Sequence, residues 1–392
     1  MGEKMNYNIL QKICMIIYLI IMAVSAIINF GTFIYFIPII GEIATLVFIP
    51  TYEINIIITS ILVIISGIYV YKNREKQGKI IFLISLLILI SIGITSVQVI
   101  TNVSNQGENI SFTEVFEMSD FSNIKVNTEY YTDQNGEKNG VNVYYTEDEI
   151  KDKPIIIYIH GGGWIKGSKD DHISMNKNFA KNGYIVISLD YELSTEEKNN
   201  WNFTEKQLCY GILWVKNNAY TYNGDTNKIY MIGDSAGGNL LLNISYKINN
   251  GEYDTIDQQE LPKINAVSVI YPVINLIDFY NNESLIMGDS AKKMVTSYVG
   301  GNPHEYSKRY ESLNPINHIT DKIPPTLIVV GERDSLVPPN STYIFAERLE
   351  KNKLKNKLIR IPYCNHAGDN SINNFMGQTY IKNTLKWFNS YK

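Results

Sequence analysis

The stretch IGDSAGGN at 232–239 places a serine between glycines in the pattern G-x-S-x-G, formed by Gly233, Ser235 and Gly237. It follows the apolar run 229–232 directly and precedes a helical run. A sharp strand-to-helix turn needs glycines, because larger side chains would collide there, and it exposes the serine hydroxyl at the carboxyl end of a sheet. The pattern therefore predicts a nucleophilic serine. A serine that only caps a helix is the alternative interpretation.

A serine hydroxyl is a weak nucleophile, so it needs a base that is oriented by a carboxylate. Among the five histidines, His366 in YCNHAGD follows the last predicted strand, where the base of such a fold lies. Asp334 comes just after the apolar run 326–330, and Glu332 is a competitor that lies nearer the strand and is interpreted as structural. The order Ser235, Asp334, His366 matches the triad order of α/β hydrolases.

A glycine-rich segment, YIHGGGW at 158–164, follows the predicted strand IIIYI. Backbone N–H groups of consecutive glycines can approach a developing negative charge closely, because no Cβ stands in the way. We predict an oxyanion hole here rather than a phosphate-binding loop, since the patterns G-x-x-x-x-G-K-[ST] and G-x-G-x-x-G are absent. His160 is interpreted as organising this loop. The candidate donors are the N–H groups of Gly161, Gly162, Gly163 and Ala236.

The pair of motifs HGGGW at 160–164 and GDSAGG at 233–238 resembles the hormone-sensitive-lipase-like branch of α/β hydrolases, the acetyl-esterase and carboxylesterase group. The resemblance covers about residues 124–390. It implies an α/β-hydrolase fold and a Ser–His–Asp esterase that acts on short acyl groups without a cofactor.

The resemblance assigns the nucleophile to Ser235, the acid to Asp334 and the base to His366. It places the oxyanion donors on Gly162, Gly163 and Ala236. The stretch YELSTEEK after Asp190 departs from the Tyr-Arg-Leu-Ala-Pro-like run that is frequent in the family, which leaves the choice of substrate open.

Short β-rich runs alternate with helical segments through the second part of the chain. Near-continuous apolar strands of this kind imply a mostly parallel sheet with helices on both faces. We therefore predict an α/β-hydrolase domain over 123–392, in which an insert at about 276–313 forms a lid. Met287 and Met294 of this insert either line an acyl pocket or pack as ordinary helix core. The predicted strands are 124–131, 141–145, 155–159, 184–189, 229–232, 266–271, 326–330 and 357–361.

The first hundred residues contain three uncharged apolar runs, at 13–37, 54–71 and 80–100. Each is long enough to cross a bilayer as a helix, which takes about 20 residues. We predict an all-α transmembrane region over 1–104 and a polar linker over 105–122. A fourth span between Gly31 and Ile49 is disfavoured, because Glu42, Pro38 and Pro50 suit lipid poorly. A cleaved signal peptide is also disfavoured, since the apolar character continues past the small residues Val24, Ser25 and Ala26.

Basic residues set the expected orientation of these spans. The segment KNREKQGK at 72–79 carries four basic residues and one acidic residue, and Lys4 and Lys12 precede the first span. Because basic flanks stay in the cytoplasm, both points are expected there, and a third span then exports the rest of the chain. The sequence thus predicts an integral membrane protein with an extracytoplasmic hydrolase domain.

Composition excludes several classes of function. The part beyond residue 100 carries six more acidic than basic residues, which argues against nucleic acid as a partner. The cysteines Cys14, Cys209 and Cys364 have no metal-ligand spacing, so no metal is expected. We expect a small-molecule ester as substrate, an envelope carbohydrate or lipid ester fitting the topology, with membrane lipid around the spans. An amidase or peptidase and a non-catalytic binding module are the alternatives, and the oligomeric state stays open.

Overall fold

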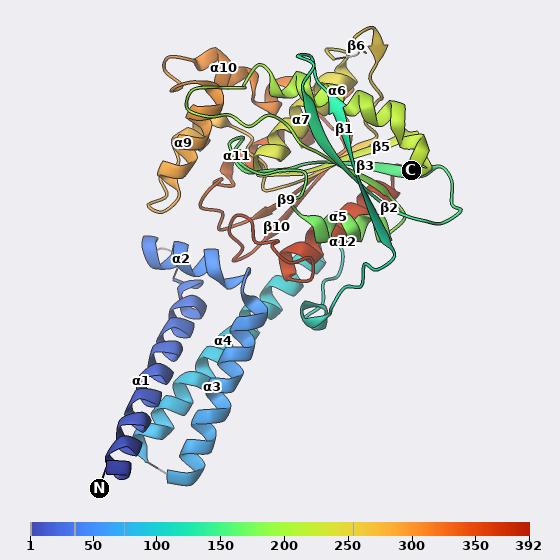
Figure 1. Cartoon of the computed structure of the whole chain (residues 1–392). Helices are drawn as coiled ribbons and strands as arrows, with labels where there is room; N and C mark the ends of the chain where they lie inside the picture. Colours follow the sequence, from blue (N-terminus) through green and yellow to red (C-terminus); the bar gives the residue numbers. More distant parts are fainter. Residues whose placement is uncertain (1, 35–36, 74, 254) are drawn as a thin grey trace.

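The computed structural model describes residues 2–34, 37–73, 75–253 and 255–392. Figure 1 shows that the N-terminal helices extend away from a larger α/β domain. These helices are α1 (Gly2–Gly31), α2 (Pro38–Phe48), α3 (Tyr52–Asn73) and α4 (Lys76–Gln106).

Three of the described helices are long and apolar enough to cross a membrane, over Ile9–Gly31, Tyr52–Asn73 and Lys76–Gln106. The first ends at Gly31 rather than at residue 37, because the chain turns there and α2 crosses α1 in close contact. A Cβ added at Gly31 would lie only 2.5 Å from the Cβ of Ala44 in α2. Within the stretch that was weighed as a fourth span, residues 38–48 form helix α2. Its 11 residues measure only about 16 Å.

Polar side chains join the long helices to one another. The Tyr18 hydroxyl of α1 donates to Leu62 O of α3 (2.8 Å), and the amides of Asn29 and Asn55 pair at 3.2 Å. Between apolar helices such contacts replace the hydrophobic driving force that holds helices together in water. They hold α1 against α3.

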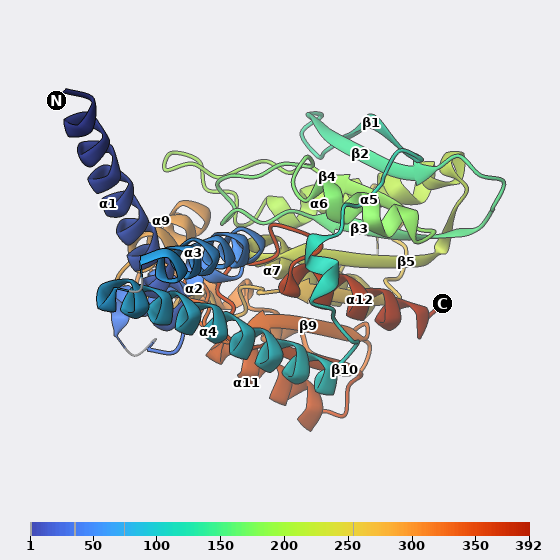
Figure 2. The ribbon, with the colours of Figure 1, turned by 90° about the horizontal axis from the view of Figure 1, so that it is seen from below.

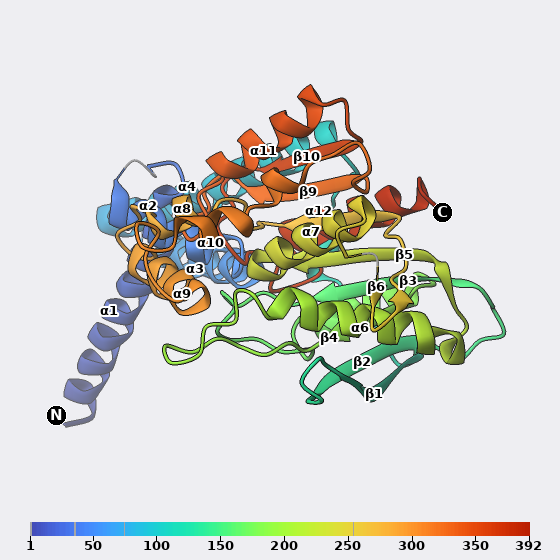
Figure 3. The ribbon, with the colours of Figure 1, turned by 90° about the horizontal axis from the view of Figure 1, so that it is seen from above.

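An eight-stranded sheet forms the centre of the α/β domain, in the order β1-β2-β4-β3-β5-β8-β9-β10 (Figure 3). The pairs β1–β2 and β2–β4 are antiparallel, and all the others are parallel. The predicted mostly parallel sheet is confirmed. The strands are β1 (Ile124–Thr132), β2 (Lys138–Thr146), β3 (Lys153–Ile159), β4 (Ile185–Leu189), β5 (Gly224–Asp234), β8 (Ala266–Ile270), β9 (Thr326–Gly331) and β10 (Asn356–Ile361).

Helices cover both faces of this sheet, because its central strands are apolar on both sides. In β3, Ile155 and Ile157 face one core, whereas Ile156 and Tyr158 face the other. The first core contains α6 (Thr204–Asn218), α7 (Ser235–Asn250), α9 (Gly288–Val299) and α11 (Asn340–Lys351); the second contains α5 (Ile173–Lys181) and α12 (Phe375–Asn389).

The second core also includes residues of the N-terminal helices. Phe48 of α2, Tyr52 of α3 and Val103 of α4 are buried in it. Helix α4 continues past its apolar part and runs beside β10 (Figure 2), where the Gln106 amide bonds both Arg360 N and Arg360 O at 2.9 Å. A 3₁₀ turn (Thr113–Phe116) then leads to β1. The N-terminal region is therefore packed onto the α/β domain over a continuous apolar surface.

Candidate active site

The G-x-S-x-G stretch forms the junction between β5 and α7. Strand β5 ends at Asp234, and Ser235 begins α7 with φ of 51°, in the left-handed region that a non-glycine residue rarely adopts. Gly237 lies so close to β3 that an added Cβ would meet Ile159 O at 2.2 Å and His160 O at 2.4 Å. The motif glycine is thus required by backbone packing, and the strained turn presents Ser235 at the carboxyl end of the sheet.

Ser235, His366 and Asp334 lie in one chain of hydrogen bonds, although they are far apart in sequence. The Ser235 hydroxyl is 3.0 Å from Nε2 of His366, and Nδ1 of His366 is 2.7 Å from Oδ2 of Asp334. The other oxygen of Asp334 accepts from the N–H groups of Leu336 (3.0 Å) and Val337 (2.8 Å). These bonds fix the carboxylate and, through it, the imidazole.

Glu332, the competitor for the acid, is directed elsewhere. Its Oε1 lies 3.1 Å from Nη2 of Arg360 on β10, in a partly exposed ion pair. The structure therefore places Asp334, and not Glu332, against His366.

The glycine loop supplies fewer free donors than the sequence analysis counted. The Gly161 N–H donates to Oδ1 of Asp234 (3.2 Å), so it is engaged and is not available to an oxyanion. In the described loop, the N–H groups of Gly162 and Gly163 have no acceptor, and Ala236 belongs to the first turn of α7, whose N–H groups lack intrahelical partners. The candidate donors are therefore Gly162, Gly163 and Ala236.

His160 organises the glycine loop, as the sequence suggests. Its ring is fully buried, stacks on Tyr191 at 4.2 Å and lies with Nδ1 2.9 Å from Gly161 O. Burial lowers its pKa below the ordinary histidine value, against the opposing effect of the Gly161 carbonyl and nearby carboxylates. A neutral ring in this place shapes the loop through its contacts with Gly161 and Tyr191.

A buried cluster of titratable groups behind the serine was missed by the sequence analysis. His172 lies between two carboxylates, with Nε2 3.9 Å from Asp234 and Nδ1 3.8 Å from Asp369. Tyr158 donates to Asp234 (2.8 Å), and Tyr271 donates to Asp369 (2.5 Å). One signal in the sequence was available, because Asp234 lies one residue before Ser235 and Asp369 lies three residues after His366.

The ionisation of this cluster is set by burial and by mutual charge. Burial lowers the pKa of His172, but Asp369, Asp234 and Asp171 outweigh it and bring the pKa above its ordinary value. Burial also raises the pKa of Asp234, although the His172 charge opposes the shift. When it is protonated, His172 forms ion pairs with both carboxylates and so bridges the two loops that carry Ser235 and His366.

Asn365, next to the candidate base, is also held in place. Its Oδ1 accepts from the N–H groups of Ser335 (2.9 Å) and His366 (2.7 Å), and its Nδ2 donates to Oγ1 of Thr45 in α2 (2.9 Å). Only the folded chain reveals this bond, because the two partners are 320 residues apart. It connects an N-terminal helix to the loop of His366.

The insert predicted as a lid packs against the glycine loop. It contains α8 (Leu276–Tyr280), α9 and α10 (Ser307–Ser312). A Cβ added at Gly163 would lie 2.4 Å from Sδ of Met294 on α9, and buried Trp164 stacks on Tyr298 of α9 at 4.7 Å. Met294 therefore borders the loop with the candidate oxyanion donors, whereas Tyr298 serves as core.

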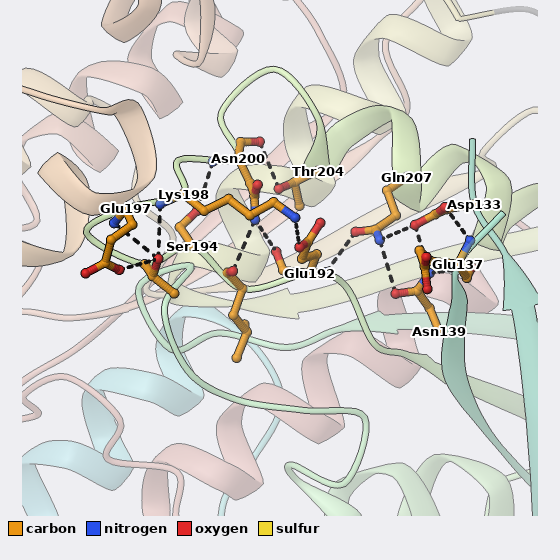
Figure 4. A network of polar contacts seen from close by, with 12 residues as sticks. Asp133, Glu137, Asn139, Glu192, Ser194, Glu197, Lys198, Asn200, Thr204 and Gln207 are labelled. Atoms are coloured by element: carbon orange, nitrogen blue, oxygen red, sulfur yellow. Dashed lines mark hydrogen bonds and ion pairs between the residues drawn. The ribbon is translucent and has the colours of Figure 1, made fainter. Parts of the chain in front are cut away.

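The YELSTEEK stretch is held by its own polar network (Figure 4). Asn200 donates its N–H to Ser194 Oγ (3.1 Å) and its amide to Glu192 O (3.2 Å), and Gln207 accepts from the Glu192 N–H (2.8 Å). The Ser194 N–H reaches Trp164 O at 2.8 Å, which ties this segment to the glycine loop. The departure from the family pattern therefore occurs directly beside the site.

Solved structures with the same architecture define the class of this domain. The Pyrobaculum calidifontis esterase is 21% identical, with a TM-score of 0.57 over 75% of this chain and 91% of its own. Carboxyl esterase 2 of Tuber melanosporum is 20% identical, with a TM-score of 0.57 over 70% of this chain and 89% of its own. The fold is that of the α/β hydrolases.

Within this class, residues 141–349, more than half of the chain, match the BD-FAE family, and the chain belongs to that family. Esterase LipC of Mycobacterium tuberculosis is 26% identical over 226 residues, which are 56% of this chain and 54% of LipC. A probable isoprenylcysteine alpha-carbonyl methylesterase of Arabidopsis thaliana, ICMEL1, is 26% identical over 57% of this chain and 47% of its own. The chain spans about half the length of the curated relatives it matches.

Proposed function

We propose that this protein is a membrane-anchored serine hydrolase that cleaves carboxylic esters with short acyl groups. The observation that carries the proposal is the continuous hydrogen-bonded chain from Ser235 through His366 to Asp334, with distances of 3.0 and 2.7 Å. The two relatives described above are named as esterases, which favours ester chemistry.

In the proposed reaction, His366 Nε2 takes the proton of Ser235 as Oγ attacks the ester carbonyl. Asp334 holds the Nδ1–H tautomer of the imidazole and stabilises the imidazolium. The alcohol leaves with the proton from His366, and water then releases the carboxylic acid from the acyl-enzyme by the same steps in reverse order.

The negative charge that forms on the carbonyl oxygen needs donors near Ser235. The N–H groups of Gly162, Gly163 and Ala236 suit this role, because a preorganised donor contributes most where water is excluded. Removing one such donor typically lowers kcat by about 10²–10³-fold.

Two parts of the proposal concern the membrane. The three long apolar helices anchor the hydrolase domain, and the basic segment 72–79 keeps their connecting end in the cytoplasm, so the hydrolase domain faces outward. Protease added to intact cells should then remove the hydrolase domain. A domain that stays uncut, while the same protease digests it in lysed cells, would contradict the orientation.

Activity is tested with the purified full chain in detergent, on 4-nitrophenyl acetate and on the matched anilide, 4-nitroacetanilide. The ester should be hydrolysed, and the Ser235→Ala variant should be inactive. Hydrolysis of the anilide but not of the ester would support an amidase. Folded protein that hydrolyses neither would support a binding module.

A further inference from the structure

Helix α2 contacts both loops that border the candidate active site. Oε2 of Glu42 accepts from the Ser284 hydroxyl (2.6 Å) and from the Ile286 N–H (3.3 Å) in the insert. Oγ1 of Thr45 accepts from Asn365 beside His366 (2.9 Å). In Figures 1 to 3, α2 and α9 lie at the end of the sheet where α7 begins. The short helix therefore contacts both the insert and the loop that carries His366.

The length of α1 places this helix at the surface of the bilayer. Its apolar stretch of 23 residues, Ile9–Gly31, measures about 34 Å, which is close to the thickness of the hydrocarbon core. Helix α2 begins at Pro38 and crosses the end of α1 (Figure 1), so it lies where the spans leave the membrane. The segments that α2 contacts, at Ser284 and Asn365, then lie near the level of the lipid headgroups.

Apolar side chains on this side of the molecule remain uncovered. Ile39, Ile40 and Ile43 of α2 are 55%, 39% and 43% exposed, and Leu285, beside the segment that bonds Glu42, is 68% exposed. An apolar helix face that adjoins membrane spans suits burial among acyl chains at the interface. The apolar surface formed by α2 and Leu285 is therefore suited to contact with lipid.

A groove of about 400 Å³ lies below α2, between α1 and α4. Its upper end meets the domain that carries the site, because Phe33 packs edge-to-face on Tyr363 with the ring centroids 5.6 Å apart. Tyr363 lies three residues before His366, and its hydroxyl donates to Gln98 of α4 (2.6 Å). The groove is lined by Phe30 of α1, by Phe33 and Ile34 in the turn that follows α1, and by Leu87, Ile90, Ser91 and Ile94 of α4.

We propose that the site takes its substrate from the membrane, and that this substrate is a lipid whose headgroup carries a short acyl ester. Its hydrocarbon tail occupies the groove between α1 and α4, and the ester passes along α2 to Ser235. The acyl group is transferred to Ser235 Oγ, and the lipid alcohol leaves with the proton from His366. Water then breaks the acyl–serine bond and yields the free acid. This inference rests on the proposed function.

The experiment compares two acetyl esters with the full chain reconstituted in phosphatidylethanolamine–phosphatidylglycerol vesicles. One is 1,2-dipalmitoyl-3-acetylglycerol, which resides in the bilayer, and the other is 4-methylumbelliferyl acetate. Both form the same acetyl-enzyme, so a difference between them reports recognition of the alcohol part. Ile90→Trp fills the groove. Ile64→Trp, on a side chain of α3 that is 60% exposed and lies outside the groove, is the matched control.

We expect Ile90→Trp to lower kcat/KM for the acetylated diglyceride about tenfold and to leave the umbelliferyl ester within about twofold of the wild type. Ile64→Trp should change neither value. Retained activity on the umbelliferyl ester also shows that the variant is folded. Ile94→Trp, at the other end of the groove wall, should repeat the selective loss.

Three results would overturn the inference. The first is that Ile90→Trp and Ile94→Trp leave diglyceride hydrolysis unchanged. The second is that the wild type cleaves only the soluble ester, in a Ser235-dependent manner. The proposed function would survive either of these two results. Absence of hydrolysis of both esters would remove the proposed function together with this inference.

Discussion

His172, which lies between two buried carboxylates, offers a direct measure of how the two loops of the candidate site are held together. Its imidazole lies 3.9 Å from Asp234 and 3.8 Å from Asp369, and only 3% of the Asp369 side chain is exposed. We predict that His172→Asn destabilises the hydrolase domain strongly. Asparagine is the suitable replacement, because His172 has φ of 51° and asparagine tolerates the left-handed region.

The expected loss follows from the two ion pairs. At 3.9 Å and an effective dielectric constant of about 20, each pair is worth about 4 kcal/mol before the cost of desolvation. Removing one partner of a buried pair typically costs about 3–5 kcal/mol, because the remaining charge stays buried. Since 22% of the His172 side chain is exposed, we expect a loss near the lower end, about 3 kcal/mol.

Urea unfolding followed by tryptophan fluorescence is the suitable assay. All four tryptophans lie beyond residue 101, so the signal reports the hydrolase domain even in the full chain in detergent. His318→Asn is the control. His318 lies 3.8 Å from Glu252, whose side chain is 49% exposed, and such a pair is worth less than about 1 kcal/mol.

The pH dependence supplies a second check. The pKa of His172 is raised in the folded state, so its contribution is complete below the unfolded value of about 6.5 and is lost as pH rises through the folded pKa. The difference between wild type and His172→Asn should therefore be largest near pH 6 and smaller near pH 9. A loss below 1 kcal/mol at pH 6, or a difference that grows with pH, would refute the reasoning.

Asp334→Asn should lower kcat on an aryl acetate by about 10³–10⁴-fold, since the amide neither stabilises the imidazolium nor favours the correct tautomer; an unchanged kcat would exclude Asp334 as the acid. Gly237→Ala should prevent stable folding of the hydrolase domain, because the new Cβ would lie 2.2 Å from Ile159 O. Gly93→Ala is the control and should fold, since no atom lies within 4 Å of the added Cβ. Urea unfolding checks both variants. Thr45→Val leaves the Asn365 amide without its acceptor and should lower kcat about threefold to tenfold. Thr59→Val, which removes only a bond to Asn55 O within α3, should leave kcat unchanged; equal effects of the two valines would argue against a role for α2 at the site.

Local patterns in the sequence were sufficient to predict the sheet and the three residues at its strand ends. The observed bounds of β3, β5 and β9 lie within five residues of the predicted ones, because a strand buried on both faces must be apolar throughout. Ser235, Asp334 and His366 follow the parallel strands β5, β9 and β10, and parallel strands bring their carboxyl ends to one edge of the sheet. The proximity of these three residues could therefore be predicted from the parallel topology of the sheet.

The tertiary structure decided which neighbouring groups are engaged, because that depends on distances between segments far apart in sequence. Gly161 looks like its neighbours in HGGGW, yet its N–H is taken by Asp234. Glu332 and Asp334 are two residues apart, and only the position of Arg360 separates their roles. The sequence also predicted apolar spans, since lipid demands about 20 apolar residues in a row. It could not predict that Thr45 of α2 would accept a hydrogen bond from Asn365, because a bond across 320 residues leaves no local pattern.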